Sequence, residues 1–150
     1  SMDLFKRRYA KMSKIIEMLR KHEGVETHAY KCTADKTTIG VGRNIDPNGG
    51  IGLSNDEIDY LLANDVERVD AELFQVFSWY DDLDDPRKDA IMDMCFNMGL
   101  PRLMQFKKAL GAMSAKNYDS AAVEFLDSRW AKQVGQRAIS ITDIIRSGES

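Results

Sequence analysis

The sequence predicts a single α+β domain over residues 1–150, in which a small antiparallel β-sheet lobe (25–53) follows the first helix. Beside it we expect a larger helical lobe, made of residues 3–23 and 54–150, with a cleft between the lobes. Two observations predict this arrangement. Glycine and β-branched residues concentrate in 25–53, and apolar residues on both sides of that segment recur at helical spacing. The length and a hydrophobic content of 43% are those of one globular domain.

An amphipathic helix is predicted at the start of the chain, ending near Glu23 and Gly24. Its apolar residues follow one another at intervals of three and four: Phe5, Tyr9, Met12, Ile16 and Leu19. Gly24 is a typical helix stop. We interpret Ser1 and Met2 as residues left by cloning ahead of the natural start, and we leave open a natural N-terminal anchor.

Two or three short strands are predicted in 25–53. Thr38, Ile39 and Val41 favour strand, and five glycines in the same segment favour turns. Ser54 and Glu57 then have the spacing of a capping box, in which each residue bonds to the backbone of the other. The sequence therefore predicts that a long helix begins immediately after the sheet.

Further helices are expected in the second half of the chain. One begins at Asp85–Pro86 and one at Pro101, because proline is favoured in the first turn of a helix. Two more are marked by apolar residues at helical spacing, which are Ala121, Phe125 and Leu126, and then Ala138, Ile141 and Ile145.

Composition excludes several classes of function. A net charge of −3 gives no basic field for nucleic acid. Cys32 and Cys95 have no spacing typical of a zinc site, and whether they form a disulfide is left open. Residues 46–57 superficially resemble a calcium loop, but Ile51 stands where that loop needs glycine. We therefore expect no metal and no cofactor.

Glu23 is a candidate general acid. A carboxyl group at the C-terminal end of a helix feels the negative end of the helix dipole, which disfavours its ionised form. Hydrolysis of a glycosidic bond needs such an acid, together with a second group on the other face of the sugar. The candidates for that second group lie in the hairpin that follows: Cys32, Asp35, Thr37 and Thr38.

The segment IIEMLRKHEGVETHAYKCTADKTTIGVGRNI (15–45) resembles the active-site segment of phage-type lysozymes, glycoside hydrolase family 24. The family pattern is a Glu in an E-G pair, a second residue nine positions later and a Thr six beyond it in T-I-G-x-G. Glu23, Cys32 and Thr38 match these positions. The resemblance continues in SNDEIDYLLANDV (54–66), MCFNMG (94–99) and the SRW…QRA run (128–138). It implies a lysozyme-like fold.

Cys32 departs from the T-even type of this family, which has aspartate there, although some signal-anchored endolysins resemble this chain in having cysteine. A free thiol has a pKa of about 8.5 and is mostly neutral at pH 7 unless its surroundings lower that value. Cys32 is therefore a thiolate base, a nucleophile, or a polar group that positions water with Thr38. The alternative is a structural cysteine, with Asp35 or no second carboxylate at work.

The resemblance also implies roles around the site for five other residues. Arg43 and Asp65 are expected to form an ion pair that ties the sheet to the long helix. Arg137 matches a family arginine near the catalytic glutamate, and Asn97 and Trp130 resemble cleft-side positions. For Trp130 the alternative is a place in the hydrophobic core.

The resemblance implies a muramidase that cleaves the β-1,4 bond between N-acetylmuramic acid and N-acetylglucosamine in bacterial peptidoglycan. The product is inverted if the resemblance extends to stereochemistry, and the sequence leaves inversion or retention open. We expect a monomeric phage endolysin that is made in the host cytoplasm and reaches the cell wall after membrane breach. Two alternatives stay open: a catalytically impaired peptidoglycan-binding domain and a lytic transglycosylase.

Overall fold

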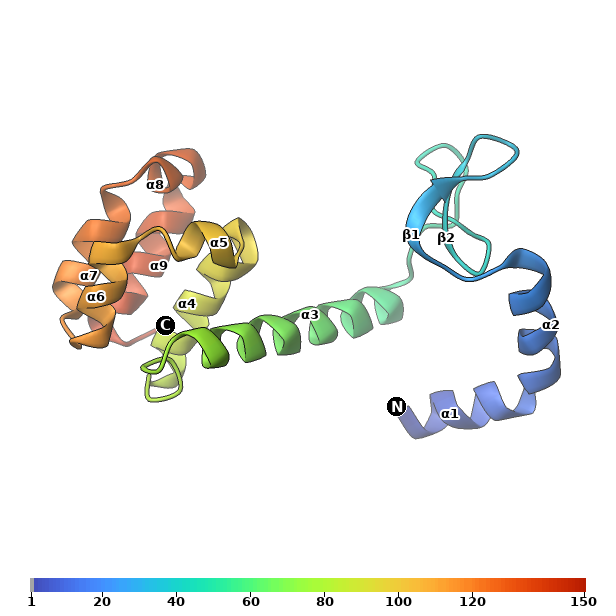
Figure 1. The fold of residues 1–150 in the computed structure, drawn as a ribbon, viewed down its shortest axis with the longest axis horizontal. Helices are drawn as coiled ribbons and strands as arrows, with labels where there is room; N and C mark the ends of the chain where they lie inside the picture. Colours follow the sequence, from blue (N-terminus) through green and yellow to red (C-terminus); the bar gives the residue numbers. More distant parts are fainter. Residues whose placement is uncertain (1) are drawn as a thin grey trace. The chain divides into compact units, whose positions relative to one another are not determined.

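The computed structural model describes residues 2–150, and Ser1, interpreted above as part of a cloning remnant, lies outside them. The chain folds into two compact units, Ser1–Asp59 and Tyr60–Ser150. Helices predominate, and a small antiparallel sheet lies in the first unit (Figure 1). The predicted α+β class is confirmed. The grouping of residues 3–23 with the helical lobe stays a prediction.

The first unit begins with two helices, α1 (Met2–Lys11) and α2 (Ser13–Glu23). The prediction of one continuous helix was wrong at Met12, where the backbone leaves the helical region with φ −104° and ψ 17°. The Met12 N–H is shared between the carbonyls of Arg8 and Tyr9. Ser13 follows, and serine is better suited to a helix start than to a helix interior. The break therefore divides the amphipathic segment into two short helices.

Three strands follow in the order β1 (Glu26–Lys31), β2 (Thr37–Gly40) and β3 (Arg43–Asn44), each antiparallel to its neighbour (Figure 1). Central strand β2 pairs Thr38 with Tyr30 on one side and with Asn44 on the other. The register between β1 and β2 shifts between Glu26 and Tyr30, so the pairing of these two strands is irregular there. The predicted small sheet in 25–53 is thus observed, and Thr38 sits at its centre.

Helix α3 (Asn55–Val76) starts where the sequence predicts, at a capping box. Glu57 Oε1 accepts from the Ser54 N–H at 2.8 Å, and Ser54 Oγ accepts from the Glu57 N–H at 3.3 Å. Each side chain satisfies a backbone donor that has no partner within the helix. The capping prediction for Ser54 and Glu57 is confirmed.

The second unit is helical, and its helices gather into a bundle (Figure 1). After α3 they are α4 (Asp85–Met98), α5 (Leu100–Leu103), α6 (Lys107–Ser114), α7 (Tyr118–Leu126), α8 (Arg129–Val134) and α9 (Gln136–Ser147). The expected helix from Pro101 is instead two, separated by a turn that places the Phe106 ring 5.4 Å from that of Phe125. Helix α8 was not predicted, although Ser128 caps it and Gly135 ends it.

The hydrophobic core of the described chain lies in this second unit. Its largest fully buried side chains are Trp130, Tyr80, Phe125, Leu73, Ile91, Met94, Leu103, Met113 and Ile145. Helix α9 packs on α4, α7 and α8, and α7 packs on α6. Among residues 2–150, no helix is both long and apolar enough to cross a membrane.

Arg87 joins the start of α4 to the end of α9. Its Nε donates to the Ile145 carbonyl at 2.6 Å and its guanidinium donates to the Arg146 carbonyl at 3.0 Å. The last carbonyls of a helix have no partner inside that helix, so these bonds cap α9 from a distant part of the chain. The same guanidinium pairs with Asp84 at 2.8 Å and lies 3.8 Å from the centre of the Tyr118 ring.

We expect Arg87→Ala to lower the free energy of unfolding by about 2–3 kcal/mol, because it removes charged hydrogen bonds to partly buried carbonyls. Urea unfolding followed by circular dichroism measures the change. Arg146→Ala is the matched control, since that guanidinium makes an exposed pair with Asp143 at 3.3 Å, and it should cost less than about 1 kcal/mol. Equal losses in the two variants would contradict the capping role of Arg87.

Candidate active site

Glu23 is the last residue of α2 and points its carboxylate at the sheet. Gly24 ends the helix with φ 78°, and its N–H donates to the Arg20 carbonyl. A Cβ placed on Gly42 would lie 2.9 Å from Glu23 Oε2 and 3.2 Å from Glu23 Cδ. The carboxylate therefore rests directly against the turn between β2 and β3. The side chain is exposed in the first unit, as access to a polymer requires.

Gly42 is the residue that makes this approach possible. Its φ of 69° lies in the left-handed region, which favours glycine, and any side chain would meet the carboxylate. Helix α2 thus packs on Gly42 through the Glu23 side chain. Gly40 has a similar φ of 70°, but a Cβ there would meet nothing within 4 Å.

Cys32 lies in the loop that joins β1 to β2. The Cys32 N–H donates to the Lys36 carbonyl at 3.0 Å, and the Asp35 N–H donates to the Cys32 carbonyl at 2.8 Å. These bonds close a tight turn in which the Lys36 N–H donates to Cys32 Sγ at 3.4 Å. The sulfur atom is thus held at the end of the hairpin, partly exposed to solvent.

The surroundings of Cys32 favour a thiolate. Hydrogen bonds from the Lys36 and Ala34 N–H groups lower the pKa of the thiol, partial burial opposes them, and the Thr38 hydroxyl lowers it further. Thr38 is only 5% exposed and its hydroxyl donates to the Lys36 carbonyl at 2.8 Å. A hydroxyl rotates, so the same group can turn its proton to a charged sulfur. The structure therefore brings Cys32 and Thr38 together.

The other two candidates for the second group are placed differently. Asp35 sits exposed at the tip of the loop with φ 61°, and its backbone N–H supports the turn. Thr37 Oγ1 accepts from Lys31 Nζ at 3.0 Å, and in a strand its side chain points to the face opposite that of Thr38. Cys32 and Thr38 are thus the better placed pair.

Asp46 is a residue of this site that sequence reasoning missed. Its carboxylate is buried and accepts from the Thr37 and Asn48 N–H groups, each at 3.0 Å. These two bonds are the main reason why the pKa of Asp46 is lowered, and Lys36 Nζ, 3.9 Å away, adds to it. Asp46 therefore fixes the start of β2, from which Thr38 projects. The D-P-N-G-G run was a signal, because aspartate commonly bonds to the backbone two residues on.

Arg43 pairs with Glu57, and the expected partner Asp65 pairs with Arg68 at 2.9 Å. Two nitrogens of Arg43 reach the two oxygens of Glu57 at 2.8 and 2.7 Å, and the same side chain donates to the Gly52 carbonyl. Arg43 and Asp65 lie in different units, so the expected pair between them stays a prediction. The capping role of Glu57 explains the choice, because it presents the carboxylate to β3. Arg43 is the main reason why the pKa of Glu57 is lowered to about 2.

Three predicted site residues lie in the second unit. Trp130 is 2% exposed, so it belongs to the core, which was the alternative for this residue. Its Nε1 donates to Asn97 Oδ1 at 2.8 Å, and Asn97 itself is exposed. Arg137 is held by Asp93, with distances of 2.9 and 2.6 Å to one carboxylate oxygen. Their roles toward a substrate stay predictions.

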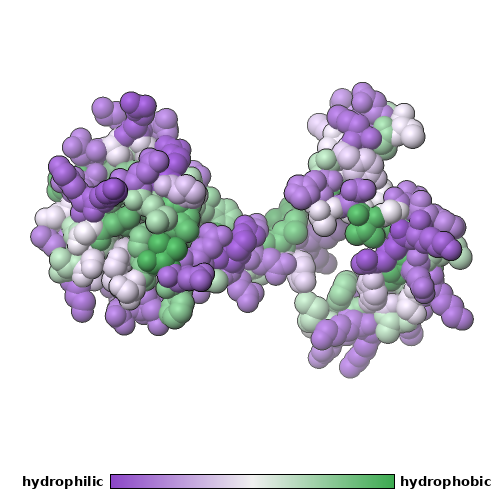
Figure 2. Space-filling model, viewed as in Figure 1, coloured by the Kyte–Doolittle hydropathy of each residue, from purple (hydrophilic) through white to green (hydrophobic). Residues whose placement is uncertain are grey.

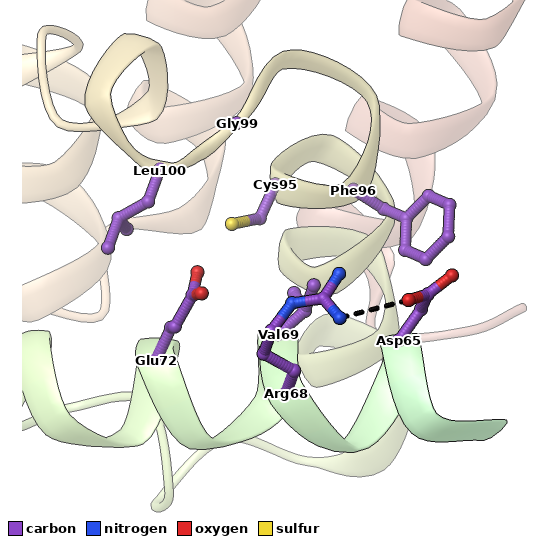
Figure 3. Close-up of a pocket in the computed structure, with 8 residues that line it drawn as sticks. All are labelled: Asp65, Arg68, Val69, Glu72, Cys95, Phe96, Gly99 and Leu100. Carbon is purple, nitrogen blue, oxygen red and sulfur yellow. Dashed lines mark hydrogen bonds and ion pairs between the residues drawn. The ribbon is translucent and has the colours of Figure 1, made fainter. Parts of the chain in front are cut away.

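A pocket of about 320 Å³ lies between α3 and α4 in the second unit, and Asp65 lines it (Figure 3). Cys95 and Glu72 point their side chains into it (Figure 3). Burial, and then the charge of Glu72, raises the pKa of Cys95, so this thiol stays neutral and is a poor nucleophile. Cys32 and Cys95 are both free, so the disulfide left open by the sequence is not formed.

Comparisons with known proteins identify the family of this chain. The sequence profile described as "Phage lysozyme" matches residues 20–143, which include Glu23, Cys32, Thr38 and most of the helical unit. "Probable T4-type lysozyme 2" from Dictyostelium discoideum is 27% identical over 91% of this chain and 96% of its own length.

Two phage proteins are similarly related. An "Endolysin" of Acyrthosiphon pisum secondary endosymbiont phage 1 is 27% identical over 80% of each chain. The "Pre-baseplate central spike protein Gp5" of Enterobacteria phage T4 is 27% identical over 88% of this chain, which is 27% of the spike protein. Because the family profile covers well over half of the sequence, the chain belongs to the phage lysozyme family and is a glycoside hydrolase of the lysozyme type.

Proposed function

We propose that the protein hydrolyses the β-1,4 bond between N-acetylmuramic acid and N-acetylglucosamine in bacterial peptidoglycan. The observation that carries the proposal is the contact of the Glu23 carboxylate with the Gly42 turn, on the same small sheet that holds Cys32 and Thr38. An acid held against the sheet by helix α2 and a second reactive group held by the β1–β2 hairpin would supply the two functions that glycoside hydrolysis needs.

The proposed reaction uses Glu23 as general acid and the Cys32 thiolate as general base. Glu23 gives its proton to the leaving oxygen as the bond from that oxygen to the anomeric carbon breaks. A water oxygen attacks the anomeric carbon from the other face, and its proton goes to Cys32 Sγ. Water attack on the face opposite the leaving group inverts the anomeric carbon. In this proposed reaction, the Thr38 hydroxyl orients the Cys32 sulfur and the attacking water.

Asn97 is proposed to face the glycan. Trp130 is proposed to have an indirect role, because it positions Asn97. The indole N–H occupies one side of the Asn97 amide oxygen, which fixes the amide in one orientation and leaves its NH₂ group to donate to a sugar hydroxyl or acetamido oxygen. The proposed place of Arg137 near the acid comes from the family resemblance alone.

The biological role we propose is that of an endolysin. The relative named as an endolysin supports it, and so does the match of the family profile. The protein would be made as a monomer in the host cytoplasm and would reach the wall after membrane breach.

Among residues 2–150, no three His, Cys, Asp or Glu side chains are placed to hold a metal ion.

One digest of purified peptidoglycan separates this proposal from its two rivals. Mass spectrometry should find fragments with a new reducing end at N-acetylmuramic acid. Anhydro sugars would identify a lytic transglycosylase instead. Binding without any fragments would identify a peptidoglycan-binding domain with impaired chemistry.

Glu23→Gln should lower the rate of peptidoglycan hydrolysis by about 10²–10⁴-fold, because the amide cannot donate a proton to the leaving group. The measurement is loss of turbidity of purified sacculi. Glu26→Gln is the matched control, since Glu26 is another exposed carboxylate at the start of β1. Its rate should be unchanged, and full activity of the Glu23 variant would remove Glu23 from the mechanism.

Cys32→Asp should keep activity within about tenfold and Cys32→Ser should lose about 10²-fold or more, because only the carboxylate replaces the base. The low-pH limb of the pH–rate profile should move to lower pH in Cys32→Asp, since a carboxyl pKa of about 3.9 lies below that of a thiol. An unmoved limb, or loss of activity in both variants, would show that the base role is wrong.

Gly42→Ala should lower the hydrolysis rate by about 10–100-fold, because the added methyl group displaces the Glu23 carboxylate from its place against the turn. Gly40→Ala is a close control, with nearly the same φ but no neighbour within 4 Å of the new methyl group. Both variants carry the same backbone strain, so similar thermal stabilities with different rates are expected. Equal rates would mean that Gly42 does not position Glu23.

A further inference from the structure

The peptide group between Lys36 and Thr37 joins a buried carboxylate to the candidate active site. Its N–H donates to Asp46 Oδ1 at 3.0 Å. Its carbonyl points the other way, because the N–H and C=O of a trans peptide lie on opposite sides. That carbonyl accepts from the Thr38 hydroxyl at 2.8 Å and from the Cys32 N–H at 3.0 Å. One planar group therefore links Asp46 to the Thr38 hydroxyl.

The Thr38 hydroxyl has one proton and two acceptors, which are the Lys36 carbonyl and the Cys32 sulfur. A hydrogen bond at the N–H end of a peptide polarises the group and makes its carbonyl a stronger acceptor, most of all when the partner is charged. The pKa of Asp46 is lowered, mainly by its bonds to backbone N–H groups, so its carboxylate is charged at neutral pH. This charge favours the carbonyl over the sulfur in the competition for the proton.

The Asp46 carboxylate is held firmly in this position. Its second oxygen accepts from the Asn48 N–H at 3.0 Å, and Lys31 and Lys36 each bring Nζ to 3.9 Å from one of its oxygens. The following turn wraps closely around it, since a Cβ on Gly50 would lie 2.5 Å from the backbone N and O of Asp46. Figure 2 shows mainly hydrophilic side chains over the small sheet and its loops, in keeping with a hairpin organised by hydrogen bonds and charges.

We propose that Asp46 is a positioning residue that holds the Thr38 proton on the Lys36 carbonyl and so keeps it off Cys32 Sγ. The Thr38 oxygen is then left to accept a hydrogen bond from the attacking water. A sulfur that gains no extra hydrogen bond in its charged form is the stronger base. The importance of this arrangement for hydrolysis rests on the base role proposed above for Cys32.

The test is an NMR titration of the Cys32 Cβ signal in the full chain, with the signal assigned by its absence in Cys32→Ser. Asp46→Asn should move the titration midpoint to lower pH and raise the thiolate fraction below the midpoint about three- to tenfold, because the Thr38 proton then turns to the thiolate. A purely structural role of Asp46 predicts the opposite direction, since a loosened turn takes the Lys36 N–H away from the sulfur. A midpoint that rises or stays in place would overturn the proposal.

Thr38→Val separates the effect of the proton from that of the charge, because it removes the hydroxyl and keeps the branched shape. In this background Asp46→Asn should move the midpoint less than half as far, since only the carboxylate charge is then lost. Equal movement in both backgrounds would overturn the proposal. Thr38→Val alone should move the midpoint little. A large rise in that single variant would place the proton on the sulfur and overturn the proposal even if Asp46→Asn does not fold.

Asp35→Asn is the matched control, since Asp35 is another carboxylate of the same hairpin and asparagine tolerates its φ of 61°. Its midpoint should stay that of the parent chain, and movement equal to that of Asp46→Asn would contradict the proposal. Thermal unfolding shows which variants are folded. The titration needs no hydrolysis, so it is separate from the test of the reaction. If the midpoints move as expected in a chain without hydrolytic activity, the role of Asp46 is supported and the proposed function fails.

Discussion

The close approach of the Glu23 carboxylate to the backbone of Gly42 is the constraint on which the candidate site depends. A helix end and a strand turn meet there with no room for a methyl group between them. The carboxylate is placed by the backbone of two elements, the end of α2 and the turn between β2 and β3. This placement is the one that the proposed role of Glu23 as general acid requires.

Buried or paired carboxylates around the site have a different task. Asp46 bonds to backbone N–H groups at the start of β2, and Glu57 joins the cap of α3 to Arg43 on β3. Both have a lowered pKa for that reason. Hydrogen bonds to these two acids join β2 to the turn after β3, and β3 to the start of α3.

Sequence patterns predicted the elements whose signals are local. The capping box at Ser54, the helix from Asp85 and the short strands around Thr38 depend on neighbouring residues, and they are where they were expected. The break at Met12 and the turn at Phe106 were missed, because apolar spacing continues across both. The second break is explained by tertiary contacts of the Phe106 ring, which a single sequence does not reveal.

The site shows the same division between local and distant information. Spacing and family resemblance predicted Glu23, Cys32 and Thr38 as site residues, but they did not predict that Arg43 pairs with Glu57. The partner of Arg43 depends on the path of the chain from residue 44 to residue 57. Glu57 pairs with Arg43 because the cap of α3 already holds its carboxylate beside β3. Trp130 looked like either a cleft or a core residue, and only its burial decides in favour of the core.

The bond from Arg87 to the Ile145 carbonyl has a consequence for how the second unit folds. The two residues are 58 positions apart, so the contact requires closure of a long loop and forms after the local helices. During synthesis Arg87 emerges well before Ile145, and its neighbour Asp84 can hold the guanidinium in the meantime. When α9 docks, its last carbonyls accept hydrogen bonds from the Arg87 guanidinium, which stays paired with Asp84.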